Sequence, residues 1–195
     1  MEIAMIQVRA PNITYWEPAV VRFGRRAIVT ASDSSVVSGV GDGYRMDLRD
    51  ANDKPAARIV LNIPQRIVTA IMRDVQLAKQ LSCVRPQANS AEVGCEFYKR
   101  FIRETPTADS LPPYSAFHVS PNKTLWVIDY MAPDDSTWSA TAFRQDGAIV
   151  GRLRAAGKGL PLAFGDDRVV IRSEDDDGDV SLVVRRIGVA AAKPK

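Results

Sequence analysis

The chain has 195 residues, of which 46% are hydrophobic and 25% charged, so it is long enough to enclose a sizeable core. The formal charge is only +3, and the Lys and Arg residues are scattered along the chain, which argues against a nucleic-acid-binding surface. No apolar run reaches the length of a membrane span, and the residues after Met1 lack the segments of an export signal. We therefore expect a globular protein with no membrane span and no nucleic-acid partner.

The first part of the chain predicts β-structure. Residues 1–10 alternate in hydropathy and predict a stray strand, with nothing before it to pair with. Residues 19–63 predict a first sheet. Its clearest hairpin consists of a strand over 44–50, a turn, and a second strand that ends near Leu61. The glycines just before that hairpin precede a strand instead of a helix, so they predict a loop and not a phosphate cradle.

Residues 64–113 have a different character and predict a helical insertion after the first sheet. Thr69 is a suitable N-cap for a helix whose apolar side would carry Ile71, Val75 and Ala78, with Met72 nearby. A second helix is predicted over residues 92–104, where apolar side chains recur at helical spacing and a Thr-Pro pair follows.

Residues 114–155 predict a second sheet. Both pleat faces of the segment 125–130 are apolar, so this strand must be covered on both sides. The next two strands, 138–143 and 148–153, are progressively more polar, which predicts that burial decreases strand by strand.

The last part of the chain predicts an incomplete sheet over residues 160–189. Three strands are visible there, and the acidic run at 175–179 is typical of a solvated hairpin turn between two of them. Residues 190–195 predict a disordered tail.

The strand-forming segments repeat. Trp126 and Val170, taken as second strands of their sheets, lie about 44 residues apart, within the roughly 40–50 residues of a propeller blade. The interval from Ile28 to Trp126 becomes similar when the helical insertion is left out. The predicted fold class is therefore all-β: a partial β-propeller of about three four-stranded blades, with the helical insertion between the first and second blade.

Three stretches carry a resemblance to a known family: Leu111-Pro112-Pro113-Tyr114-Ser115 with Thr124 to Val127, Trp138 with Phe143-Arg144-Gln145-Asp146-Gly147, and Leu162 to Val170. Together they resemble the closing portion of bacterial six-bladed β-propeller proteins related to the NHL-repeat type. The resemblance implies the fold and little chemistry, because propellers carry many unrelated functions. It also implies export for a full-length parent, to the periplasm or the cell exterior, whereas this chain shows no signal of its own.

Three blades cannot surround an axis, and the outer faces of the first and last blades would be apolar and exposed. Three solutions are open. The chain is the latter half of a longer product, two copies associate as a homodimer that completes the ring, or the sheets collapse into a sandwich. We expect a partial propeller.

Four residues are candidates for ligand contact. Tyr15 and Trp16 lie in a Pro-flanked segment that could line the mouth of a pore, although tryptophans in such folds are more often packing residues. Asp129, at the end of an inner strand, and Asp33, in the corresponding place of the earlier unit, are candidate axial carboxylates. Propeller enzymes of the resembled type imply that such carboxylates could bind a metal such as calcium.

Cys83 and Cys95 lie within the predicted insertion and are too far apart for a CxxC redox or zinc pair. If the parent is exported, as the resemblance implies, they could form a disulfide between the two helices; in a reducing compartment they are ordinary thiols. His118 is the sole histidine and lies between apolar residues on a predicted strand, which favours a packed histidine over a ligand or base.

The sequence contains no nucleophile elbow, Walker or zinc-protease motif. We therefore expect a noncatalytic binding module with no cofactor, which holds a small molecule or a protein. The alternative is part of a propeller hydrolase or lyase with an axial, carboxylate-bound metal.

Overall fold

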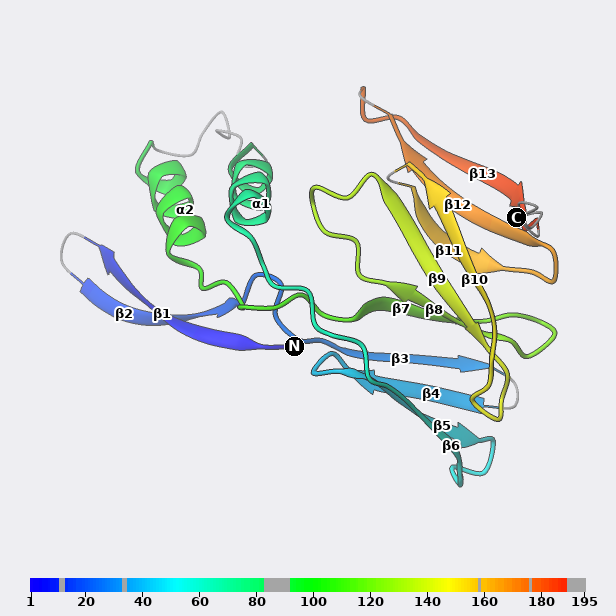
Figure 1. Cartoon of the computed structure of the whole chain (residues 1–195). Helices are drawn as coiled ribbons and strands as arrows, with labels where there is room; N and C mark the ends of the chain where they lie inside the picture. Colours follow the sequence, from blue (N-terminus) through cyan, green and yellow to red (C-terminus); the bar gives the residue numbers. More distant parts are fainter. Residues whose placement is uncertain (11–12, 33–34, 83–91, 158, 176, 189–195) are drawn as a thin grey trace. The chain divides into compact units, whose positions relative to one another are not determined.

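The computed structural model describes residues 1–10, 13–32, 35–82, 92–157, 159–175 and 177–188 (Figure 1). These residues are mostly β-structure with two short helices, so the all-β fold class is confirmed. They form two compact units where the sequence predicted one domain over 1–189. Unit 1 is Met1–Arg26, Pro64–Pro112 and Ala132–Asp134, and unit 2 is Ala27–Ile63, Pro113–Met131 and Asp135–Lys195.

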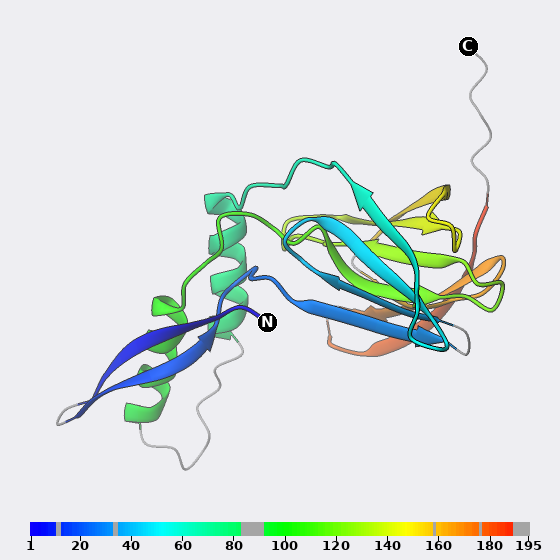
Figure 2. The same cartoon turned by 90° about the horizontal axis from the view of Figure 1, so that it is seen from below.

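Unit 1 joins the N-terminal strands to the helical insertion. Its elements are β1 (Ile3–Ala10), β2 (Ile13–Val20), α1 (Ala70–Ser82) and α2 (Glu92–Glu104). β1 pairs with β2 in an antiparallel hairpin that places Ile3 opposite Val20. The first strand, predicted to stand alone, therefore finds its partner in the segment that follows it. The two helices lie side by side, and α2 packs against β1 (Figures 1 and 2).

α1 begins where the sequence predicts, because the Thr69 hydroxyl accepts a hydrogen bond from the Met72 amide at 3.2 Å. The predicted apolar side of this helix is wrong. Ile71 and Val75 are exposed, and Met72 is the buried residue. The reason is a polar contact that hydropathy does not register, since Gln80 turns inward to accept a hydrogen bond from Arg22 at 2.6 Å.

Arg22 is the buried centre of unit 1. Its Nε donates to Gln80 of α1, and its Nη1 donates to the carbonyl oxygen of Thr105, just past the end of α2, at 2.6 Å. Its own amide and carbonyl are bonded to Pro106 and Ala108. A cation is favoured at a helix C-terminus, so one side chain ties both helices to the chain that leaves the hairpin.

Unit 2 consists of three antiparallel sheets, each an up-and-down meander (Figure 1). Their strands, sheet by sheet, are β3 (Ala27–Ser32), β4 (Ser35–Val40), β5 (Tyr44–Asp50) and β6 (Pro55–Leu61); β7 (Tyr114–Val119), β8 (Leu125–Asp129), β9 (Thr137–Phe143) and β10 (Ile149–Ala156); and β11 (Leu160–Phe164), β12 (Arg168–Glu174) and β13 (Val180–Arg186). We call them the first, second and third sheets. Ile28, Trp126 and Val170 belong to three different sheets, as the repeat predicts.

The strands of the first sheet differ from those predicted. The apolar residues 19–23 were expected to form its first strand, but Ala19 and Val20 belong to the end of β2. Ile28, which was expected in the second strand of the sheet, therefore lies in its first strand, β3. The strand that sequence reasoning missed is β4, which contains Gly39 and lies in the stretch interpreted as a glycine loop. Gly39 occupies a position where any side chain would collide with Tyr114.

The sheets are stacked face to face with two apolar clusters between them. One cluster joins the first and second sheets and includes Met46, Tyr114 and Val127; the other joins the second and third and includes Trp126, Ile128 and Phe164. β8 contributes to both clusters, which confirms that its two apolar faces are covered. Burial falls along these three strands as predicted: four of the five residues of β8 and five of the seven residues of β9 are buried, and none of β10 is.

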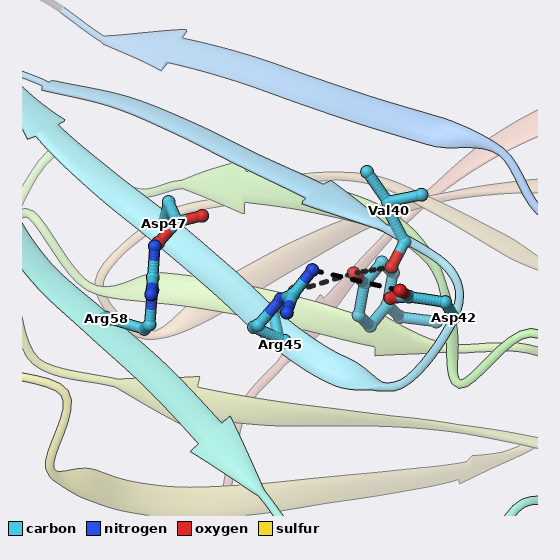
Figure 3. A network of polar contacts seen from close by, with 6 residues as sticks. Val40, Asp42, Arg45, Asp47 and Arg58 are labelled. Atoms are coloured by element: carbon cyan, nitrogen blue, oxygen red, sulfur yellow. Dashed lines mark hydrogen bonds and ion pairs between the residues drawn. The ribbon is translucent and has the colours of Figure 1, made fainter.

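The outer face of the first sheet is apolar on β3 and β4, where Val29, Val36 and Val40 are exposed, and carries charged side chains on β5 and β6. Across β5 and β6, Asp47 forms an ion pair with Arg58 at 2.5 Å, and Arg45 lies 3.8 Å from Asp42 (Figure 3). The outer face of the third sheet is mixed as well, because Val180, Leu182 and Val184 of β13 are exposed and lie opposite Glu174, Arg172 and Val170. Exposed apolar side chains are therefore present on both end faces, as expected, together with charged ones.

Candidate functional site

The β1–β2 hairpin has one buried face and one open face. Its pairing places Ile3 opposite Val20, Met5 opposite Pro18 and Gln7 opposite Trp16, so these six residues share one side of the ribbon. We call this side the hairpin face. Its large apolar side chains, those of Ile3, Met5, Trp16 and Val20, are 42–60% exposed.

The opposite side of the same hairpin is covered. Ile6 and Ala19 are buried there, and α2 lies against β1. Because side chains alternate along each strand, the apolar residues of one side are buried within unit 1, and those of the other side are exposed to solvent. A hairpin needs only one apolar face to fold onto a helix, so the second apolar face is not explained by the packing of unit 1.

Charged residues of both signs flank the hairpin in the chain, with Glu2 before it and Arg25 and Arg26 after it. The Glu2 carboxylate accepts a hydrogen bond from the Arg25 amide at 3.1 Å, and the side chains of Glu2, Arg25 and Arg26 are exposed. An apolar patch with a polar rim is the usual anatomy of a protein interface.

Trp16, a ligand-contact candidate from the sequence, thus lies on the hairpin face. Tyr15 is in β2 opposite Val8, and its side chain lies outside the described residues, as does all of Asp33. Asp129 belongs to unit 2, at the end of β8. The sequence did not single out Ile3, Met5 and Val20, although their alternation with Ile6 and Ala19 was visible once the hairpin register was known.

Asp129 is the centre of a second, polar group between the first and second sheets. The Ser139 hydroxyl donates to its Oδ2 at 2.6 Å, and Ser139 comes from the neighbouring strand β9. Burial raises the pKa of the Asp129 carboxyl, while the Ser139 hydrogen bond and the charge of Arg152 oppose the rise. Tyr44, on β5, faces the same region: burial and then the Asp129 charge raise the pKa of its phenol. Its hydroxyl is buried beside Thr141 and Asp129.

The Asp129 group as described supplies one carboxylate, and Asp33, the other candidate, lies outside the described residues, so the calcium alternative stays a prediction. Calcium takes six to eight oxygen ligands, usually from several carboxylates, whereas Asp129 shares its surroundings with two hydroxyls and the cation Arg152. Nowhere in the described part of the chain do three His, Cys, Asp or Glu side chains gather as a metal site would require. The Asp129 carboxyl is half-buried and can gain or lose one proton, and it lies at the end of β8, next to the apolar cluster between the first and second sheets.

The other sequence candidates are placed as follows. His118 lies on β7 with its ring 5.7 Å from that of Phe164, and burial lowers its pKa, so it is a packed histidine as predicted. Cys83 and the side chain of Cys95 fall outside the described residues, and the proposed disulfide stays a prediction. Neither described helix is long and apolar enough to cross a bilayer.

No family model, curated protein or solved structure matches the chain.

Proposed function

We propose that this chain is a noncatalytic binding module that holds a partner protein on the hairpin face. The observation that carries the proposal is the open apolar side of β1–β2, with Trp16, Met5 and Ile3 displayed together while the reverse side is buried. Solvent exposure of four large apolar side chains on one small ribbon is unfavourable unless a partner covers them.

The composition of the face favours a protein as the occupant. Tryptophan and methionine are enriched at protein interfaces, and tryptophan is among the residues that contribute most to binding free energy. A face that binds anionic lipid would be bordered by several Lys or Arg, whereas here Glu2 lies beside Arg25. The partner is expected to present an apolar groove or strand edge with charges of both signs around it.

For unit 2 we propose the role of a scaffold of β-propeller type. Its support is the stacking of successive antiparallel meanders through apolar clusters on both sides of β8. In the chain, the hairpin precedes the first sheet and the two helices lie between the first and second sheets. In this proposal the sheets provide rigidity and unit 1 provides specificity.

The test is a direct titration. A partner is first isolated with the immobilised full chain, then purified and titrated against the wild type and the variant Trp16→Ser by calorimetry. We expect Trp16→Ser to weaken binding by at least about tenfold, because a buried tryptophan anchor contributes on the order of 2 kcal/mol or more. Since Trp16 is 60% exposed, its replacement should leave unit 1 folded.

Val60→Ser is the matched control, because Val60 is an apolar residue of similar exposure on β6 of unit 2. It should bind the partner as the wild type does. Equal affinity of the Trp16→Ser variant and the wild type would overturn the proposal, and so would binding to anionic vesicles with no protein partner. Turnover of an ester or glycoside that is abolished by Asp129→Asn would favour the enzyme alternative instead.

A further inference from the structure

Among the residues that the structure describes, the third sheet ends in a strand with no neighbour on its outer edge. The first and second sheets each have four strands, and the third has three, in the order β11-β12-β13. Within the described residues, β13 pairs with β12 alone. An edge strand of this kind presents a row of backbone amides and carbonyls to any further strand.

The side chains of β13 do not discourage such pairing. Natural edge strands are usually protected by a central lysine, a proline or a bulge. β13 has the sequence VSLVVRR, its register with β12 is regular from Val180 to Arg186, and its central residues are apolar. Val180, Leu182 and Val184 lie on the same exposed face, and Leu182 is 66% exposed.

The charges along β13 are divided between its two ends. The turn that precedes the strand carries Asp175, Asp177 and Asp179, and the strand ends in Arg185 and Arg186. The Asp175 carboxylate is occupied within the turn, where it accepts hydrogen bonds from the amides of Asp177 and Asp179. Arg186 lies 3.5 Å from Asp167 of its own sheet. Asp179 and Arg185 are exposed at opposite ends of the strand.

A strand with an acidic start and a basic end is complementary to itself in the antiparallel direction. If β13 is laid against a copy of itself with full overlap, Val183 lies at the centre and Leu182 faces Val184 of the second copy. Arg185 then faces Ser181 of the second copy, with Asp179 of that copy at the diagonal position on the same side of the sheet. The arrangement has two-fold symmetry, so every contact occurs twice.

We propose that the chain forms a homodimer through antiparallel pairing of β13 with β13 of a second copy. The two three-stranded sheets become one six-stranded sheet. Two Leu182–Val184 cross-strand contacts cover part of the exposed apolar face, and two Asp179–Arg185 pairs fix the register. This dimer differs from closure of a ring, because it uses the edge of the third sheet and not its face.

Sedimentation equilibrium of the full chain tests the proposal. We expect a wild-type dimer, and we expect Leu182→Lys, Asp179→Arg and Arg185→Asp each to raise the dissociation constant by at least about tenfold. The double variant Asp179→Arg with Arg185→Asp restores opposite charges and should return most of the affinity. This recovery also excludes misfolding as the cause of the single-variant losses.

Two controls locate the interface. Val150→Lys places a lysine on an exposed position of β10, the edge strand of the second sheet, and should leave the dimer intact. Trp16→Ser should leave it intact as well, which separates this proposal from the one for the hairpin face. Amide hydrogen exchange in β13 should slow as the protein concentration increases.

Two results would overturn the proposal. The first is a wild-type protein that sediments as a monomer up to about 100 µM, a concentration at which even weak dimers form. The second is a dimer that withstands Leu182→Lys and both charge reversals but is dissociated by Val150→Lys or Trp16→Ser.

Discussion

Replacement of Gly39 by alanine tests how the first and second sheets fit together. Gly39 lies in β4, and a Cβ built on it would meet the Tyr114 hydroxyl oxygen closer than side chains approach one another in folded proteins. The same Cβ would lie 3.0 Å from the Arg45 carbonyl oxygen and 3.0 Å from Cζ of Phe117. The Tyr114 hydroxyl is held in place by two carbonyl oxygens. It donates a hydrogen bond to the carbonyl oxygen of Arg45 at 2.8 Å, and the carbonyl oxygen of Val40 lies 3.2 Å away (Figure 3).

The size of the effect follows from these contacts. Overpacking by one methyl group costs about 1–3 kcal/mol in a well-packed core. Alanine in place of glycine returns about 0.5–1 kcal/mol through the lower entropy of the unfolded chain. We therefore expect Gly39→Ala to lower the free energy of unfolding by about 1–2 kcal/mol.

Tyr114→Phe provides the second arm of a double-mutant cycle. The variant removes the hydroxyl and leaves a buried carbonyl without its donor, at a cost of about 1–2 kcal/mol. It also removes the atom nearest to the new Cβ. Gly39→Ala should then cost about 1 kcal/mol less in the Tyr114→Phe background than in the wild type, which is a coupling typical of residues in contact.

Urea denaturation followed by tryptophan fluorescence measures the cycle. Trp126 and Trp138 are buried in unit 2, whereas Trp16 is already exposed, so the signal reports on unit 2. Gly43→Ala is the matched control, because a Cβ at Gly43 meets nothing within 4 Å. If Gly39→Ala is as stable as the wild type, or if the two substitutions are additive, the contact between β4 and Tyr114 is not as described.

Two further predictions concern pH. Burial raises the pKa of Asp129 above its ordinary value of 3.8, so the folded state holds this proton more tightly and loses stability as pH rises through the folded pKa. Asp129→Asn should therefore unfold at higher urea than the wild type at neutral pH, with a difference that shrinks as pH falls through the folded pKa and is lost below pH 3.8; a constant difference would contradict this. Burial lowers the pKa of His118 below 6.5, so wild-type stability should decline as pH falls from 6.5 towards the folded pKa, and His118→Phe should lack this decline. A proton NMR titration of this sole imidazole gives its pKa directly, and a value above 6.5 would refute the packing described for His118.

The local features of the fold are determined by neighbouring residues and could be predicted. Leu125 and Val127 alternate with Trp126 and Ile128, and such a strand has no stable place except between two layers. Thr69 caps α1 because its hydroxyl reaches an amide three residues away. Both inferences need only the geometry of one element.

The candidate site was partly predictable for the same reason. Trp16 drew attention as a large aromatic residue, but the hairpin face depends on the pairing of Ile3 with Val20 and of Gln7 with Trp16. The first strand was predicted to stand alone, and without a register its residues could not be assigned to a face shared with β2. The same applies to β13, whose self-complementary charges matter only because the sheet ends there.

The sequence by itself determined the strand-rich composition of this protein, its two helices and the need to cover both sides of β8. Tertiary structure alone decided that α1 buries Met72 instead of Ile71 and that β4 forms despite Gly39. Each of these outcomes depends on a partner far away in the chain, such as Arg22 for Gln80 or Tyr114 for Gly39. Hydropathy and propensity describe a residue and its neighbours, whereas these contacts form only when distant segments meet.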